Sequence, residues 1–168
     1  AELLSYGLLR GSFIPPQEIR DLRDLTRYRK TLIQQRANEC NRIQKLLEDC
    51  NIKLASVATD ILGVSGWDML TAIADGESDP ERLANMARRT LRKKIPQLIE
   101  ALRGIISQNQ RWILGQQLKQ IAHFDEMIGE LNERIEELTA PYASLIEKLC
   151  EIPGVSQRIA QVIIAEIG

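Results

Sequence analysis

Two long runs of residues with coiled-coil spacing constrain the fold of this chain more than any other feature. In the second run the apolar residues recur mostly every three or four positions, as Leu114, Leu118, Ile121, Phe124, Ile128, Leu131, Ile135 and Leu138. The glutamates of this run lie largely on the opposite face, and Thr139, Ala140 and Pro141 end it. Such a repeat is typical of a long amphipathic helix that packs along another helix.

The first run begins after Pro16 and has no proline or glycine from Gln17 to Leu62. Its apolar residues recur near a seven-residue repeat, as Ile19, Leu22, Leu25, Leu32, Ile43, Leu46, Leu47 and Cys50. A helix continuous to Asp49 would span about 50 Å at about 1.5 Å per residue. We therefore predict an all-α fold, namely a long antiparallel coiled coil with short helices at its tip, followed by a helix-hairpin-helix. A plain helical bundle is the alternative, and apolar surface left over on such long helices also favours self-association.

Turn signals divide the segment between the two runs into short helices. The sequence G-V-S-G at 63–66 marks a turn, with Ser65 predicted to cap a helix that ends near Ala74. Asp79–Pro80 is a typical helix start, because aspartate caps well and proline fits the first helical position. Its helix is predicted to carry Leu83, Met86, Ala87 and Thr90. Ile95–Pro96 marks the next boundary.

Composition agrees with packed helices and excludes several classes of protein. Only 4% of residues are aromatic while 44% are hydrophobic, which suits helices better than a sheet. The formal net charge of -1 means that the chain as a whole is not a generic polyanion binder. No apolar run is long enough to cross a bilayer, and no signal peptide is visible at the start, which also lacks a Met. We expect a piece of a cytoplasmic protein without a membrane partner.

The near-neutral total hides an uneven distribution of charge. A compact basic cluster contains no acidic residue and is the first predicted contact with a nucleic-acid backbone; it consists of Arg88, Arg89, Arg92, Lys93 and Lys94. A solvated face is the alternative for this cluster. On the first long helix, Arg20, Arg23 and Arg27 share one face. For these three, pairing with nearby acids or with the acidic segment 125–137 is favoured over contact with phosphates.

The C-terminal residues 149–168 resemble a helix-hairpin-helix, a module that holds nucleic-acid phosphates without distinguishing bases. The turn and the start of the second helix would expose backbone N–H groups to an anion, and Gly154 would allow close approach. Ser156 stands where the usual pattern has a second glycine, and it can cap the second helix instead. The second predicted nucleic-acid contact is therefore Gly154, Val155, Ser156, Gln157 and Arg158. A Pro-Gly turn between two core helices is the alternative.

No catalytic residue, metal site or cofactor site is predicted within the chain. The phosphate-binding loop motifs and paired metal-ligand motifs are absent from the sequence. His123 is the only histidine and has no positioned nucleophile beside it. Cys40, Cys50 and Cys150 match no metal motif and fit reduced thiols in a cytosol.

Four stretches together resemble one known family. They are AELLSYGLLRGSFIPPQEIRDLRDLTRYRK at 1–30, NRIQKLLEDCNIKL at 41–54, ILGVSGWDML at 61–70 and LCEIPGVSQRIAQVIIAEIG at 149–168. These stretches are similar to the middle of transposases of the insertion-sequence "one-ten" family. The resemblance covers essentially the whole chain, and the linker at Gly7–Pro16 distinguishes it from generic coiled coils.

The resemblance implies a domain plan and a set of partners. Residues 1–16 would be the end of a RuvC-like domain and its linker, 17–140 a coiled-coil helical domain, and 141–168 the start of the transposase domain. The family's acidic tetrad and serine nucleophile map onto no residue here, so divalent metal such as Mg²⁺ is implied only for the parent recombinase. DNA, a structured guide RNA and a homo-oligomer are the implied partners in DNA transposition, in a prokaryotic, nucleoid-associated setting. A purely structural dimerisation module without nucleic-acid contact is the alternative.

Overall fold

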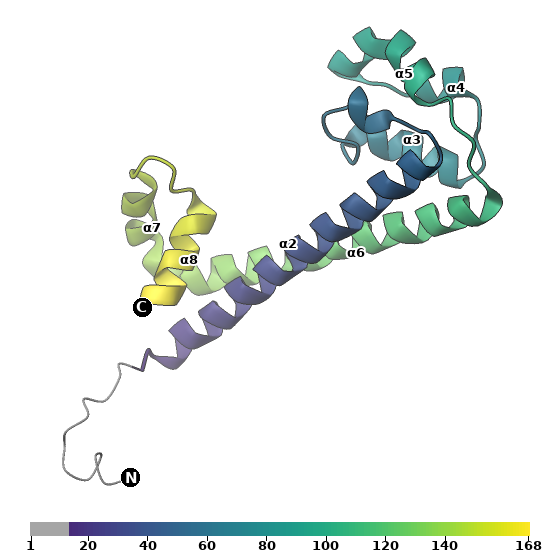
Figure 1. The fold of residues 1–168 in the computed structure, drawn as a ribbon. Coiled ribbons are helices and arrows are strands. Elements are labelled where there is room, and N and C mark those ends of the chain that lie inside the picture. The colour runs from purple at the N-terminus through teal and green to yellow at the C-terminus, as the bar shows by residue number, and fades with distance from the viewer. Residues whose placement is uncertain (1–13) are drawn as a thin grey trace, which may run out of the picture. The chain divides into compact units, whose positions relative to one another are not determined.

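The computed structural model describes residues 14–168, and every regular element in this range is helical. The all-α prediction is thus confirmed (Figure 1). The elements in chain order are α2 (Gln17–Asp49), η1 (Leu54–Ser56), α3 (Val64–Ala74), α4 (Pro80–Ala84), η2 (Arg89–Lys94), α5 (Ile95–Ala101), α6 (Gln108–Thr139), η3 (Ala140–Tyr142), α7 (Ala143–Cys150) and α8 (Gln157–Ile167). Residues 1–13, most of the expected domain end and linker, lie outside the described residues. Within them, no helix combines the length and apolarity that a bilayer-spanning segment needs.

The chain divides into two compact units. Of the described residues, unit 1 joins 14–31 with Gly129–Gly168, and unit 2 is Leu32–Ile128. Both long helices, α2 with 33 residues and α6 with 32, therefore contribute one part to each unit. The domain boundaries expected after residues 16 and 140 come from the family resemblance and stay a prediction.

The core of unit 2 forms where α2 and α6 pack together and α3, α4 and α5 cover them. Apolar residues of both long helices belong to one buried cluster with residues of the short helices; among them are Ile43, Leu47, Leu114, Leu118, Ile121, Met69, Leu70, Ile73, Leu83 and Leu98. Earlier on α2, Arg36 pairs with Asp125, later on α6, at 2.5 Å between Nε and Oδ1. The two helices therefore run antiparallel within this unit. The finer knobs-into-holes packing of a coiled coil stays a prediction.

The first long helix ends through its own sequence rather than through a proline. Asn51 adopts a left-handed conformation with φ of 57°. Its N–H donates to the Glu48 carbonyl at 2.9 Å, and the next N–H, of Ile52, donates to the Leu47 carbonyl at 2.8 Å. This pair of bonds is a Schellman motif, which satisfies the last carbonyls of a helix. Asparagine tolerates the left-handed conformation better than most residues, so Asn51 turns the chain towards α3.

Unit 1 is built on the beginning of α2, the end of α6 and the hairpin of α7 and α8. Its core is a separate buried cluster that consists of Ile19, Leu22, Ile135, Ile146, Ala160, Ile164 and Ala165. Figure 1 shows α7 and α8 side by side, joined by the turn at residues 151–156. The hairpin therefore buries one face of each helix and leaves its turn in solvent.

Candidate nucleic-acid interface

The basic cluster Arg88–Lys94 does not lie on an α-helix. The helix predicted to run from Asp79 through Thr90 starts as expected, with Asp79 as N-cap and Pro80 in its first turn, but α4 ends at Ala84. The chain then turns, because Met86 and Ala87 donate to carbonyls only three residues earlier, and a 3-10 helix spans Arg89–Lys94. The prediction of a single helix through Thr90 was therefore wrong.

The side chain of Ser65 in α3 fixes the position of the chain after this turn. The Arg88 N–H donates to Ser65 Oγ at 2.9 Å, with Arg88 in an extended conformation. Ser65 was predicted to cap α3, but the N-cap residue is Gly63, and no side chain caps that helix. The Ser65 hydroxyl thus holds the start of the basic segment against the first turn of α3.

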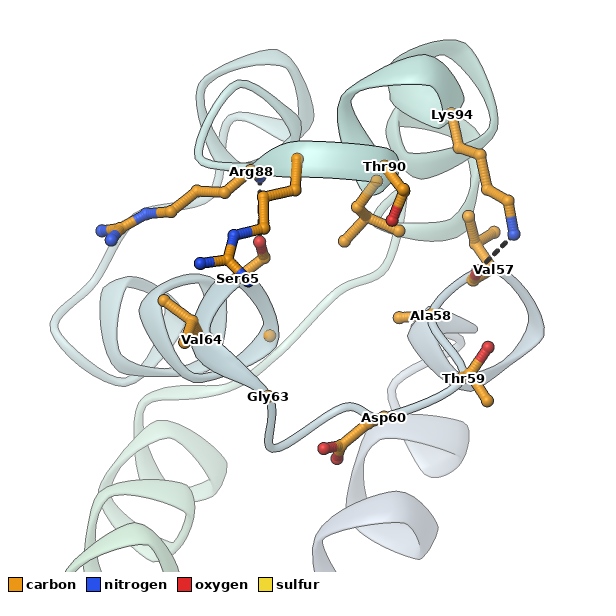
Figure 2. A pocket seen from close by; sticks show the side chains of 13 residues that line it. Val57, Ala58, Thr59, Asp60, Gly63, Val64, Ser65, Arg88, Thr90 and Lys94 are labelled. Atoms are coloured by element: carbon orange, nitrogen blue, oxygen red, sulfur yellow. Dashed lines mark hydrogen bonds between the residues drawn. The ribbon is translucent and has the colours of Figure 1, made fainter.

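These elements enclose a hollow of about 700 Å³ in unit 2. Figure 2 shows its three walls: the segment Val57–Asp60, the first turn of α3, and the basic segment with Arg88, Thr90 and Lys94. Arg89 also lines the hollow, and it has a φ of 51°, which is rare for a residue with a side chain. Such a conformation persists only where its surroundings hold it, and it is found often at binding sites.

The five cations of the cluster differ in their partners. Arg88 forms an ion pair with Asp68 of α3 at 2.5 Å, so the cluster is not wholly uncompensated, as the sequence had suggested. Lys94 Nζ donates to the Val57 carbonyl at 3.1 Å, which fixes its position and keeps its charge unpaired (Figure 2). Arg89, Arg92 and Lys93 are exposed and form no ion pair with any described residue.

The cluster also divides between two hollows. Arg88, Arg89 and Lys94 line the first, whereas Arg88 and Arg92 line a second of about 750 Å³ on the other side of α3. Carboxylates repel a phosphate, and the second hollow has two, of Asp68 and Asp75, whereas the first has one, of Asp60. Lys93 lines neither hollow. The first hollow is therefore the better anion site of the two.

The first turn of α3 contributes donors to this hollow. Because no side chain caps α3, the N–H groups of Val64 and Ser65 are left for an outside acceptor. Gly66 follows, and a Cβ there would lie 2.1 Å from the Ile61 carbonyl oxygen. Only glycine allows the backbone of α3 to approach Ile61 so closely, which positions this turn beside the basic segment.

The predicted second contact lies in the turn between α7 and α8 of unit 1. Gly154 has a φ of 88° and open space around it, so its role in the protein is conformational. Ser156 caps α8 by accepting the Ile159 N–H, which leaves the N–H groups of Gln157 and Arg158 for an outside acceptor. Val155 packs against the unit 1 core, whereas Gly154, Gln157 and Arg158 are exposed. Binding of phosphate at this turn stays a prediction.

The comparisons with known proteins concern the first part of the chain. Residues 1–52 match a family model named DEDD_Tnp_IS110, which is described as Transposase. This stretch is therefore similar to transposase sequence. The match confirms the resemblance to the one-ten insertion-sequence family, and within the described residues it covers α2. No curated protein and no solved structure matches the chain.

The basic face of α2 mostly binds acceptors elsewhere in this chain. Arg23 Nε donates to the Ala165 carbonyl at 2.8 Å, and Arg27 binds the Glu166 carboxylate through two hydrogen bonds of 2.8 and 2.7 Å. The hydrogen bond and charge of Arg27 lower the pKa of Glu166, and Glu166 raises the pKa of Arg27 in return. Pairing was the favoured prediction for this face, but Arg23 and Arg27 bind the end of α8 rather than nearby acids of α2 or the acidic segment of α6.

A buried arginine of α2 was not predicted as a functional residue. Arg29 is only 4% exposed and donates through Nη1 to the amide oxygens of Asn132 and Gln161. Burial lowers its pKa, and the charge of Arg158 lowers it further. No carboxylate of the described residues pairs with it. The buried cation Arg29 of α2 and the exposed cation Arg158 of α8 therefore lie near each other in unit 1.

The described part of the chain provides no group of three or more residues that could hold a metal ion. His123 lies exposed on α6, 3.6 Å from Glu126. Burial raises the pKa of the Cys40 and Cys50 thiols, which makes them poor nucleophiles. We therefore assign no described residue to catalysis or to the divalent metal that transposases of this family generally require.

Proposed function

We propose that this chain binds nucleic-acid backbones for a DNA transposase, and that the hollow of unit 2 is its main contact. The observation that supports this most directly is that Arg89, Lys94 and the uncapped first turn of α3 line the same hollow. Guanidinium, ammonium and backbone N–H groups are the donors that proteins use for phosphate oxygens. The transposase match at residues 1–52 makes DNA the first partner to test, with a structured guide RNA second.

The long helices would serve as the scaffold that positions this contact and joins protomers. Buried apolar residues hold α2 to α6 in each unit, whereas Ile128 and Leu131 of α6 are only half-buried. We infer that this seam, as a coiled coil, also meets a second copy of the chain. Asp substitutions at Ile128 and Leu131 should then lower the mass measured by light scattering, because an unpaired charge in an apolar interface costs several kcal/mol. A wild-type chain that is monomeric at high concentration would refute the oligomer.

One observation favours the alternative, a purely structural module. Arg23, Arg27 and Arg36 of α2 all bind acceptors on α8 or α6, so many cations of the chain stabilise its own fold. If the cations of the basic segment were also only solvated, the chain would bind nucleic acid no better than other proteins of its charge.

The salt dependence of nucleic-acid binding distinguishes the proposed backbone contact from the purely structural module. Four cations of the segment have no carboxylate partner, namely Arg89, Arg92, Lys93 and Lys94. At about 0.9 per neutralised phosphate, the log-log salt slope on duplex DNA should not exceed about 4. Binding should show little dependence on base sequence, since phosphate contacts carry no sequence information.

The test is a gel-shift titration of duplex DNA and structured RNA at several salt concentrations. The double variant Arg89→Glu with Lys93→Glu should reduce both affinity and slope. Lys45→Glu with Lys119→Glu is the matched control, because these exposed lysines of α2 and α6 lie outside the segment and the change in net charge is the same. Equal binding by the wild type and the segment variant at low salt would leave the structural module as the better interpretation.

The hairpin of unit 1 is tested separately. Gly154→Asp would place a carboxylate beside the N–H groups of Gln157 and Arg158. Its effect should add to that of the segment variant if both sites contact one nucleic acid. We also expect the chain alone to show no metal-dependent strand cleavage, and cleavage by the purified chain would contradict the absence of a catalytic set.

A further inference from the structure

We propose that Asp68 of α3 restrains the nucleic-acid contact by holding the Arg88 side chain away from it, so that a phosphate competes with this carboxylate for the guanidinium. This inference rests on the proposed function and concerns the control of the same site. It is carried by the placement of the pair: Arg88 lines both hollows of unit 2, whereas Asp68 lines the second and not the first.

The backbone of Arg88 is fixed independently of its side chain. The Arg88 N–H donates to Ser65 Oγ at 2.9 Å, in the wall of the first hollow (Figure 2). The side chain ends instead at Asp68, where Nη2 lies 2.5 Å from Oδ2. An arginine side chain rotates about several single bonds between staggered conformations. Its charge can therefore move from one hollow to the other while the segment stays in place.

The ion pair is open enough to water to be exchanged. The side chain of Arg88 is 62% exposed and that of Asp68 is 34% exposed. Pairs of this kind contribute little to stability, because water and salt screen them. A phosphate offers the guanidinium an equivalent acceptor, since arginine binds both carboxylates and phosphates through two parallel hydrogen bonds. The exchange costs the fold little, but it leaves an unpaired carboxylate close to the polyanion.

The salt dependence of binding detects this competition, because it counts the ions that binding releases. When Arg88 leaves Asp68 for a phosphate, one cation leaves the DNA and another gathers at the freed carboxylate, so the net release is close to zero. Asp68→Asn keeps the shape and an amide oxygen for Arg88 but removes the charge. Its log-log salt slope on duplex DNA should exceed that of the wild type by about 0.9. Binding should tighten about twofold to fivefold, the range that an exposed ion pair accounts for.

The test is a gel-shift titration of duplex DNA with the purified chain at several salt concentrations. Asp75→Asn is the matched control, because Asp75 lines the same second hollow and its loss changes the net charge equally, yet it forms no ion pair with any residue of 14–168. A second comparison uses chains that already carry Arg88→Gln. If Asp68 acts through Arg88, adding Asp68→Asn to such a chain should change binding no more than adding Asp75→Asn does.

Two results would overturn the inference and leave the backbone contact standing. One is an Asp68→Asn chain that binds duplex DNA no more tightly than Asp75→Asn, with the slope of the wild type. The other is an equal gain from Asp68→Asn with and without Arg88, because a general loss of negative charge would then explain it. A merely structural pair would lower the midpoint of urea unfolding without raising the salt slope. If the wild type binds neither duplex DNA nor structured RNA, the proposed function itself fails.

Discussion

Replacing Gly66 by alanine tests the close approach that builds the hollow. Gly66 lies in the first turn of α3, and an added Cβ would meet the Ile61 carbonyl oxygen at 2.1 Å and its carbonyl carbon at 2.6 Å. Contacts under 3.0 Å essentially never occur for a real Cβ. Both neighbours are backbone atoms, so no flexible side chain can move aside, and α3 must shift away from Ile61.

The expected cost follows from two opposing effects. Forcing an extra carbon into a packed site costs typically about 1–3 kcal/mol, and backbone neighbours place Gly66→Ala at the upper end. Alanine in a helix recovers up to about 1 kcal/mol relative to glycine. We therefore expect a net destabilisation of about 2 kcal/mol.

Urea unfolding followed by circular dichroism at 222 nm measures this difference. With a slope of about 1–3 kcal/mol per molar urea, the midpoint should fall by roughly 1 M. Gly115→Ala is the matched control, since Gly115 lies within α6 of the same unit and its nearest neighbour, the Ala74 Cβ, is at an ordinary 3.8 Å. This control should be as stable as the wild type or more stable. A Gly66→Ala midpoint at or above that of the wild type would refute the close approach.

Three further substitutions test other local features. Arg27 lowers the pKa of Glu166 in the folded chain below its ordinary value of 4.5. Their pair therefore stabilises the fold fully above pH 4.5, and this stabilisation is lost as the pH falls through the lowered pKa. Glu166→Gln should flatten the pH dependence of Tm in that acidic range. Asn51→Gly should retain stability at φ of 57°, whereas Asn51→Ala should cost about 1–2 kcal/mol in urea unfolding. Ser156→Ala should cost about 1 kcal/mol by removing the cap of α8, and Ser156→Gly only a few tenths.

The helical elements could be predicted because their causes are local in sequence. The repeats of Leu and Ile mark the buried faces of α2 and α6, and Asp79–Pro80 marks the start of α4. Each of these signals involves residues only a few positions apart, so the sequence alone is enough to recognise it. The early end of α4 was missed because it depends on a distant hydroxyl, that of Ser65, which holds the Arg88 N–H across 23 residues.

The candidate site was only half predictable for the same reason. Its cations are adjacent in sequence and were found, but the walls that make them into a hollow come from segments around Val57 and Val64. No signal near Arg88 in the sequence indicates that Asp68 is its partner. One signal was available: the glycine at 66 lies next to Ser65 at the start of α3, where a close approach of backbones was a reasonable expectation.

The net charge of -1 is compatible with the proposed contact with nucleic acid, because some cations of this chain pair with its own carboxylates and others do not. Arginines on the long helices meet acceptors on facing helices, as Arg27 meets Glu166 and Arg36 meets Asp125, and these pairs contribute nothing to long-range attraction. The cations of the 3-10 helix Arg89–Lys94 form no ion pair with any residue of the described range 14–168, so their charges are not neutralised locally. Attraction of a polyanion depends on this local field rather than on the sum of charges. Arg89 and Lys94, which line one hollow without an ion pair to any described residue, would therefore provide the proposed contact despite the net charge of the chain.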